Sequence, residues 1–265
     1  NFCNSKRGYT EYVGIFGYIY GGSIKNLLIG NCNLTVEYGE SIGILAAIIE
    51  NAKIEGCVAT GYIEYDSRYS CSVGMLAGYV YESEIKNCSV WGDIRVFSDE
   101  EYVHMGGFIG TASQVTINDC FSATNLLLLD EYFENYIGGF IGTSGESSIN
   151  NCFVTGYVLS YNPAYIGGFI AYSDECEIYN CYRIKGQEVY EGDYPVRDDT
   201  LPEVDPNEAK TEQFYSKKLR WDTNEWKLPG RDFEGGIYPY PYIDSHDEHE
   251  AIIIPAREPT LYAYG

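Results

Sequence analysis

The sequence predicts an all-β fold: a parallel β-helix, or β-solenoid, of about six coils with a small C-terminal capping segment. The main observation is a segment of about 15 residues that recurs six times at a spacing near 30 residues. The second is composition, because the 265-residue chain contains 29 Gly and 27 Tyr. Glycine at regular spacing between Ile, Val, Tyr and Phe runs indicates short strands joined by tight turns.

The repeat is clearest from Gly74 to Cys88. The other copies start at Val13, Gly43, Gly106, Gly138 and Gly167. The six starts are 30, 31, 32, 32 and 29 residues apart, and the variation in length falls after the Cys position. Each copy therefore occupies the same environment as the copy before it, which is the property of a solenoid coil.

Four positions of the repeat keep their residue type. The third is large and apolar, namely Ile15, Leu45, Leu76, Phe108, Phe140 and Phe169. The fifth is very small, namely Gly17, Ala47, Gly78, Gly110, Gly142 and Ala171. The twelfth is always isoleucine, namely Ile24, Ile54, Ile85, Ile117, Ile149 and Ile178. The fifteenth is Leu27 and then Cys57, Cys88, Cys120, Cys152 and Cys181.

These columns predict strands that pair in register with the next coil, about 4.8 Å away. The Ile and Cys columns then form a structural ladder inside the solenoid, and the Gly/Ala column marks a close approach of backbone or a corner. The position before the Cys is Asn26, Gly56, Asn87, Asp119, Asn151 and Asn180. These types tolerate left-handed backbone angles, so we expect a bend there, with amides stacked in a ladder.

A second strand follows the Cys, as in 152–158, and ends in a polar insert of variable length, such as 98–102 or 130–134. Inserts of this kind are expected to be surface loops on one side of the solenoid.

The motifs Gly106-Gly-Phe-Ile-Gly110, Gly138-Gly-Phe-Ile-Gly142 and Gly167-Gly-Phe-Ile-Ala171, with Ile149-Asn-Asn-Cys-Phe-Val-Thr-Gly156, resemble the GLUG repeat. That repeat occurs in bacterial adhesin-like surface proteins and in the non-catalytic region of IgA-specific metalloendopeptidases. The resemblance covers roughly 13–186, and it weakens in the first two copies. It implies a β-solenoid on a secreted or wall-associated protein, and it implies no activity for the repeats themselves.

The composition changes near Gln187, where prolines begin to interrupt the strand pattern. We therefore divide the chain into solenoid repeats (1–186), a C-terminal cap (187–243) and a linker or tail (244–265). The cap is expected to hold one short helix over 207–219, capped near Asp205 or Asn207, and to cover the open end of the solenoid. Segments 214–222 and 238–243, with Trp226, are similar to those that close many GLUG-bearing regions.

Five of the nine cysteines recur at the repeat period, and they are read as a buried column of free thiols rather than a disulfide framework. Four lie outside the column, and the sequence leaves open whether they form disulfides: Cys3, Cys32, Cys71 and Cys176. The column contains no Cys-x-x-Cys pair, so no metal site is predicted.

The formal charge of −22 disfavours nucleic acid, whose phosphates need clustered Lys and Arg. No apolar run is long enough to cross a membrane, so no direct membrane insertion is expected of this fragment. The cluster His246-Asp-Glu-His249-Glu250 lacks the His-Glu-x-x-His spacing of a zinc site, and we read it as solvated linker. Acidic residues of the inserts lack the spacing of a calcium loop and are read as solvated charge: Asp66, Asp99, Glu100, Glu101, Asp130, Glu131 and Glu134.

No catalytic, cofactor-binding or metal-binding residue is predicted. The most suggestive surface feature is a set of tyrosines that could stack sugars or bury against a protein, namely Tyr62, Tyr65, Tyr79, Tyr81, Tyr157 and Tyr161. The expected function is a non-catalytic repeat module of a secreted or cell-surface bacterial protein, in adhesion or as a stalk, with a protein or glycan as partner. The alternatives are a non-catalytic segment of a large surface metalloprotease and a polysaccharide-active β-helix enzyme.

Overall fold

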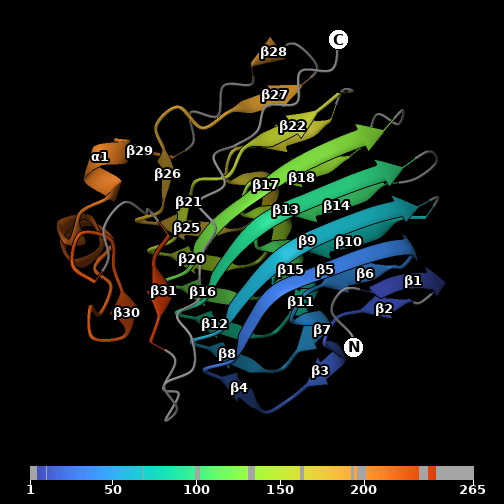
Figure 1. The fold of residues 1–265 in the computed structure, drawn as a ribbon, viewed down its shortest axis with the longest axis horizontal. Coiled ribbons are helices and arrows are strands. Elements are labelled where there is room, and N and C mark those ends of the chain that lie inside the picture. Colours follow the sequence, from blue (N-terminus) through green and yellow to red (C-terminus); the bar gives the residue numbers. More distant parts are fainter. Residues whose placement is uncertain are drawn as a thin grey trace.

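The chain folds as an all-β parallel solenoid, which confirms the predicted fold class (Figure 1). The computed structural model describes residues 5–9, 11–67, 69–98, 102–130, 135–161, 164–191, 194–195, 201–232 and 238–242. Within these residues the only helices are two short ones in the C-terminal segment. No described helix has the length and apolar character that a membrane-spanning helix needs.

Each repeat contributes to four sheets, which we name B, C, D and A in the order in which the chain enters them. Every strand of B, C and D pairs in parallel with the equivalent strand of a neighbouring repeat. Sheet B holds β2 (Tyr12–Val13), β6 (Ser41–Gly43), β10 (Cys71–Gly74), β14 (Val103–Gly106), β18 (Tyr136–Gly138) and β23 (Tyr165–Gly167). Sheet C holds β3 (Phe16–Tyr20), β7 (Ala46–Glu50), β11 (Ala77–Tyr81), β15 (Ile109–Ser113), β19 (Ile141–Gly145) and β24 (Ile170–Asp174). Sheet D holds β4 (Ser23–Lys25), β8 (Lys53–Glu55), β12 (Glu84–Lys86), β16 (Thr116–Asn118), β20 (Ser148–Asn150) and β25 (Glu177–Tyr179).

Sheet A contains the longest strands and forms the broad face in Figure 1. Its strands are β1 (Ser5–Tyr9), β5 (Leu28–Tyr38), β9 (Val58–Ser67), β13 (Ser89–Ser98), β17 (Phe121–Asp130), β21 (Phe153–Val154), β22 (Val158–Ser160), β26 (Tyr182–Ile184), β27 (Val189–Glu191), β28 (Tyr194–Pro195) and β29 (Glu203–Val204). Pairing of β27 with β22 and of β29 with β26 carries this sheet past the expected boundary at residue 186.

Left-handed residues make the bends between sheets. At the D–A bend, the predicted Asn/Gly/Asp column has positive φ in all six repeats, from 52° at Asn87 to 64° at Gly56. Its side chains form a partial ladder, in which Asn180 Nδ2 donates to Asn151 Oδ1 and Asn151 Nδ2 donates to Asp119 Oδ1, both at 2.9 Å. The C–D bend has a second such column, which the sequence pattern does not reveal: Gly21, Asn51, Glu82, Gln114, Glu146 and Glu175. Its mixed composition hides it, because Glu and Gln are not typical left-handed residues.

The interior is built from stacked columns. The six isoleucines of sheet D pair directly across neighbouring strands, and the four between Ile54 and Ile149 are at most 1% exposed. Ile178, in the last repeat, is 37% exposed. At the turn from B to C, the rings of Phe108, Phe140 and Phe169 stack nearly parallel at centroid distances of 4.7 and 4.8 Å.

The first repeat departs from the predicted alignment. Val13 pairs with Ile42, which puts Gly14 rather than Val13 opposite Gly43. Phe16 nevertheless pairs with Ala46, so this repeat is one residue shorter in the turn from B to C. Ile15 therefore lies opposite Ile44 rather than Leu45, and in this outermost coil it is 38% exposed.

The C-terminal segment packs on the side of the solenoid rather than over its open end. It contains α1 (Pro206–Ala209), η1 (Phe214–Lys218), β30 (Trp226–Lys227) and β31 (Tyr240–Pro241). Asp205 caps α1 through a 2.8 Å bond from Asn207 N, but the expected single helix is broken into two pieces. Apolar groups of this segment pack against Phe121 and Phe153 on sheet A. In the described residues, the last strands of sheets B, C and D have no strand on their outer side.

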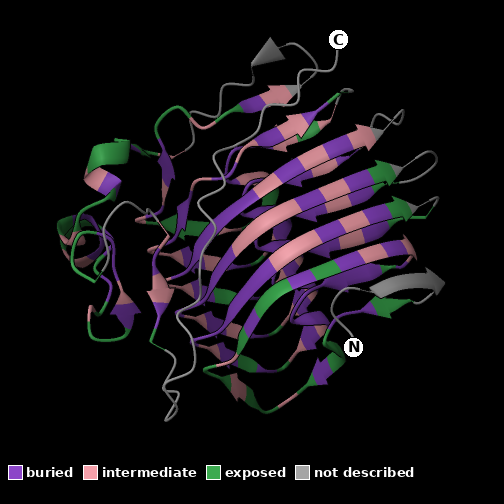
Figure 2. Cartoon of the chain, in the orientation of Figure 1, coloured by how far each residue is buried: buried purple, intermediate pink, exposed green. Residues whose placement is uncertain are grey.

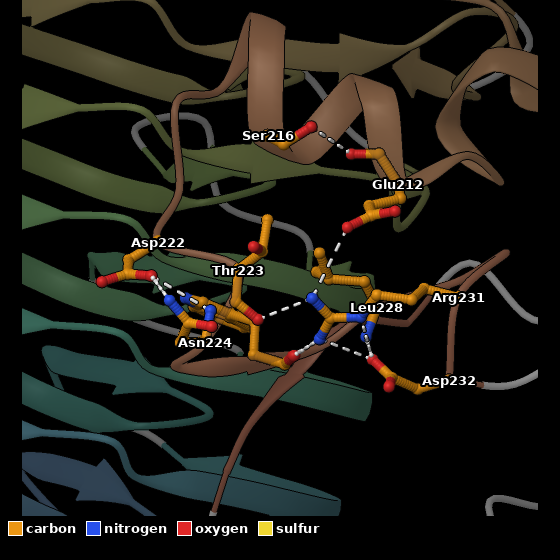
Figure 3. A network of polar contacts seen from close by, with 9 residues as sticks. Glu212, Ser216, Asp222, Thr223, Asn224, Leu228, Arg231 and Asp232 are labelled. Carbon is orange, nitrogen blue, oxygen red and sulfur yellow. Dashed lines mark hydrogen bonds and ion pairs between the residues drawn. The ribbon is translucent and has the colours of Figure 1, made fainter.

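Arg231 holds the loops of this segment together (Figure 3). Its guanidinium donates to the backbone carbonyls of Thr223 and Trp226, and it pairs with Asp232 at 2.8 Å. The carboxylate of Asp232 in turn accepts from Leu228 N at 2.8 Å. The segment is therefore a defined unit, held by its own polar contacts as well as by apolar packing.

Candidate ligand-binding face on sheet A

The outward face of sheet A brings together residues that are about one repeat apart in the sequence. Buried and partly exposed residues alternate along the long strands (Figure 2). On β9, Ile63 and Tyr65 are buried, whereas Tyr62 and Glu64 are partly exposed and face outward. Tyr62 pairs with Asp93, and Asp93 pairs with Asn125. Tyr157 extends this line, because Leu126 pairs with Val158 one residue further along. We call Tyr62, Asp93, Asn125 and Tyr157 the axial row.

Hydrogen bonds hold the two central members of the axial row. Asn125 Nδ2 donates to Asp93 Oδ1 at 3.0 Å, and the backbone N–H of Tyr157 donates to Asn125 Oδ1 at 3.3 Å. The amide is therefore fixed in orientation on both sides. Asp93 and Asn125 keep further acceptor and donor capacity toward solvent, since a carboxylate offers about four lone-pair sites and an amide two N–H groups.

A second row beside the first carries one positive charge. Glu64 pairs with Arg95, whose guanidinium carbon lies 5.6 Å from the centre of the Tyr62 ring. Tyr62 Oη donates to Glu64 Oε2 at 2.6 Å. Burial, together with this hydrogen bond, raises the pKa of Tyr62, and burial raises the pKa of Tyr157. Both phenols are therefore neutral at physiological pH.

The row of Arg95 becomes apolar toward the C-terminal repeats, because Arg95 pairs with Leu127 and Leu127 pairs with Leu159. The next row toward the insert ends of the strands is also apolar, and in it Phe97 pairs with Leu129. Tyr161 follows β22 directly and is exposed. Sheet A thus shows a polar–aromatic zone next to the C-terminal segment and an apolar zone at the opposite ends of its strands.

The structure separates the six tyrosines that the sequence suggested as one face. Tyr62 lies on β9 of sheet A, and Tyr157 and Tyr161 directly flank β22 of the same sheet, whereas Tyr79 and Tyr81 lie on β11 in sheet C. Tyr65 is fully buried and donates a 2.6 Å hydrogen bond to Gly39 O, so its assignment to the surface was wrong. The signal was available, because Tyr62 and Tyr65 are three residues apart on one strand and cannot share a face.

The seam between sheets B and C holds a second line of polar groups, which includes His104 on β14. Its Nδ1 lies 2.8 Å from Thr143 Oγ1, and its ring stacks on Tyr136 at 5.2 Å. Ser72 Oγ lies 2.8 Å from Thr111 Oγ1 one repeat earlier. Burial lowers the pKa of His104, which keeps this imidazole neutral at pH 7. These contacts join sheets B and C, and they occupy the polar groups of the four side chains that make them.

The described residues contain no group of three or more His, Cys, Asp or Glu side chains arranged to hold a metal ion. The cysteines of the column are buried free thiols, and burial raises the pKa of Cys88 and Cys152. Outside the column, Cys71 is a buried thiol, Cys176 is a partly exposed thiol, and Cys32 is disulfide-bonded. Cys3, the 246–250 cluster and most of the acidic insert residues lie outside the described residues.

The fold and this face define a parallel β-solenoid with an outward polar–aromatic surface on its longest sheet. A similar solved structure is that of a protein from Bacteroides ovatus proposed to be an immunoglobulin A1 protease. The two share 15% sequence identity with a TM-score of 0.51, over 86% of this chain and 76% of the other. At this identity the similarity establishes the fold alone. No protein-family model and no curated protein matches the sequence.

Proposed function

We propose that this chain is a non-catalytic, GLUG-like segment of a secreted or cell-surface bacterial protein, and that it binds a surface ligand or acts as a stalk. The observation that supports the proposal most is the uninterrupted stacking of columns from repeat to repeat. Such a core makes a rigid rod with long side faces, which suits presentation and binding.

The similarity to the Bacteroides ovatus protein supports one specific alternative for this chain, namely a non-catalytic segment of a large surface protease whose active site lies elsewhere. We rank adhesion first and this protease alternative second. A polysaccharide-active enzyme is the least favoured, because Asp93 and Glu64 are held by neighbouring donors rather than paired with each other across an open site.

Two measurements test the proposal. The purified chain is incubated with immunoglobulin A1 and, separately, with a panel of polysaccharides, and we expect no product above the blank. Turnover that disappears in Asp93→Asn would overturn the non-catalytic assignment. In cells that express the natural protein, antibodies against the solenoid should label intact cells, and labelling that requires permeabilisation would overturn the surface assignment.

A further inference from the structure

The axial row has the composition and geometry of a binding site for an extended ligand. Its members lie on successive strands of one parallel sheet, in the order aromatic, carboxylate, amide, aromatic. Adjacent strands are about 4.8 Å apart, so three steps from Tyr62 to Tyr157 span about 14 Å along the solenoid axis. Hence a ligand that used all four groups would lie along the axis and cross the strands.

The polar groups of the row are held in place before any ligand arrives. The hydrogen bonds from Tyr157 N to Asn125 and from Asn125 to Asp93 fix the planes of both side chains. These side chains are carried by β13 and β17, which are paired along their whole length. Binding therefore requires little further ordering, which lowers the entropic cost of association.

We propose that the axial row binds an uncharged oligosaccharide, and this inference rests on the proposed role as a surface-binding segment. Sugar hydroxyls both donate and accept, so neighbouring hydroxyls can engage the carboxylate of Asp93 and the amide of Asn125 together. The rings of Tyr62 and Tyr157 offer apolar faces for the C–H faces of sugar rings at either end.

Charge selects against acidic ligands. The chain carries a formal charge of −22, and Asp93 and Glu64 contribute negative charge at the row itself. Arg95 is the cation beside the row, and it already lies opposite Glu64 and over the Tyr62 ring. A uronic acid or sulfated sugar would therefore meet net repulsion.

A protein partner would use a different part of the same sheet. Protein interfaces favour a desolvated apolar centre, and on sheet A the apolar side chains lie outside the axial row: Leu127 and Leu159 in the row of Arg95, and Phe97 and Leu129 in the row beyond it. This separation allows the two kinds of partner to be distinguished by mutation.

The test uses the complete chain and a defined set of probes. An array carries uncharged oligosaccharides of glucose, mannose, galactose and N-acetylglucosamine, beside uronic acid and sulfated counterparts. The oligosaccharides are roughly three to six units long, so that they can reach along the span of the axial row. The best uncharged probe is then measured by titration calorimetry with the wild type and with Asn125→Ala, Tyr157→Ala and Leu129→Ser. Circular dichroism and the urea midpoint establish that each variant is folded.

We expect binding to uncharged probes only, with Asn125→Ala and Tyr157→Ala each weakening it about tenfold or more, as loss of one good contact does. Leu129→Ser should bind as the wild type does. The conservative variant Asp93→Asn keeps the shape of the row and should reduce discrimination against uronic acid probes. The proposal is overturned if no uncharged probe binds, if acidic probes bind better, or if only Leu129→Ser alters the binding. Those results leave cell-surface labelling unaffected, so failure of this proposal is distinguishable from failure of the proposed function.

Discussion

The backbone N–H of Cys88 points at the sulfur of Cys120 in the next repeat, with an N–Sγ distance of 3.5 Å. The Cys120 thiol in turn lies 3.1 Å from its acceptor, the carbonyl oxygen of Asn118. Cys57 and Cys152 donate in the same way to Cys88 and Cys181. The cysteine column is therefore a line of small apolar groups that also provides a hydrogen-bond acceptor for a buried N–H at the bend.

This role predicts the effect of changing Cys120. Cys120→Val keeps a small apolar side chain but removes the acceptor of Cys88 N, and we expect a loss of about 1–3 kcal/mol in the free energy of unfolding. Cys120→Ser should cost less, because Ser83 performs both functions at the C–D bend, accepting from Ala52 N at 3.1 Å and donating to Tyr81 O at 2.7 Å. Urea unfolding of both variants measures the difference. Equal losses would show that the thiol only fills space.

The Asn/Gly/Asp column at the D–A bend contains one carboxylate, Asp119. A variant at this position should therefore change how the stability of the protein depends on pH. Burial raises the pKa of Asp119 above its usual value, so the folded state holds the proton more tightly than the unfolded state does. Stability is then lost as pH rises from the unfolded pKa through the folded one. Asp119→Asn should therefore be more stable than the wild type at pH 7. This gain in the free energy of unfolding should shrink below about pH 4, which is the pKa of Asp in the unfolded chain. Chemical unfolding at several pH values measures this.

The matched control for that experiment is Asn87→Asp in the same column. It introduces a carboxylate at a buried position, so it should destabilise the solenoid at neutral pH and recover in acid. A gain in Asp119→Asn that is the same at pH 3 and pH 7 (roughly below and above the unfolded pKa) would contradict the assigned cause.

The shorter first repeat predicts unequal effects at two residues that the sequence places in one column. Phe140→Ala removes a buried ring from the stack and should cost about 3–5 kcal/mol. Ile15→Ala acts on a side chain that is 38% exposed and should cost less than about 1 kcal/mol. Urea midpoints of the two variants compare them directly. A loss of stability at Ile15 as large as that at Phe140 would show that Ile15 belongs to the phenylalanine column after all.

Two glycines of one repeat should respond in opposite ways to alanine. A Cβ at Gly138 would lie 1.9 Å from Ile141 O, so Gly138→Ala must push backbone apart and should cost about 1–3 kcal/mol. A Cβ at Gly145 meets nothing within 4 Å, so Gly145→Ala should leave stability unchanged or raise it slightly. Thermal and urea unfolding provide the comparison, and a neutral Gly138→Ala would mean that the turn from B to C is less tight than described.

The lateral position of the C-terminal segment can be tested by hydrogen exchange. Trp221 Nε1 donates to Asn151 O at 2.7 Å, and the Trp221 ring stacks on Trp226 at 4.1 Å. Trp221→Ala should therefore increase amide exchange around 150–154 and leave 165–179 as in the wild type. Increased exchange confined to 165–179 would instead indicate a segment that covers the open end.

The sequence by itself determined the solenoid, its period and the identity of its columns. Residues such as Ile54, Ile85 and Ile117 recur because every repeat offers the same environment, so the period is visible without a structure. The same period links Tyr62, Asp93, Asn125 and Tyr157, which are 31, 32 and 32 residues apart. The axial row could thus have been found from spacing, but no shared residue type drew attention to it.

Only the tertiary structure decided three other features: the one-residue shortening before Phe16, the left-handed bend through Glu82, and the packing of Trp221 on the side of the coils. The physical reason is that each bend resets the alternation of inward and outward side chains. Counting residues along the sequence therefore cannot predict, across a bend, whether a side chain points inward or outward. The docking of a non-repeating segment depends on the shape of the assembled surface, and that surface exists only once the coils have stacked.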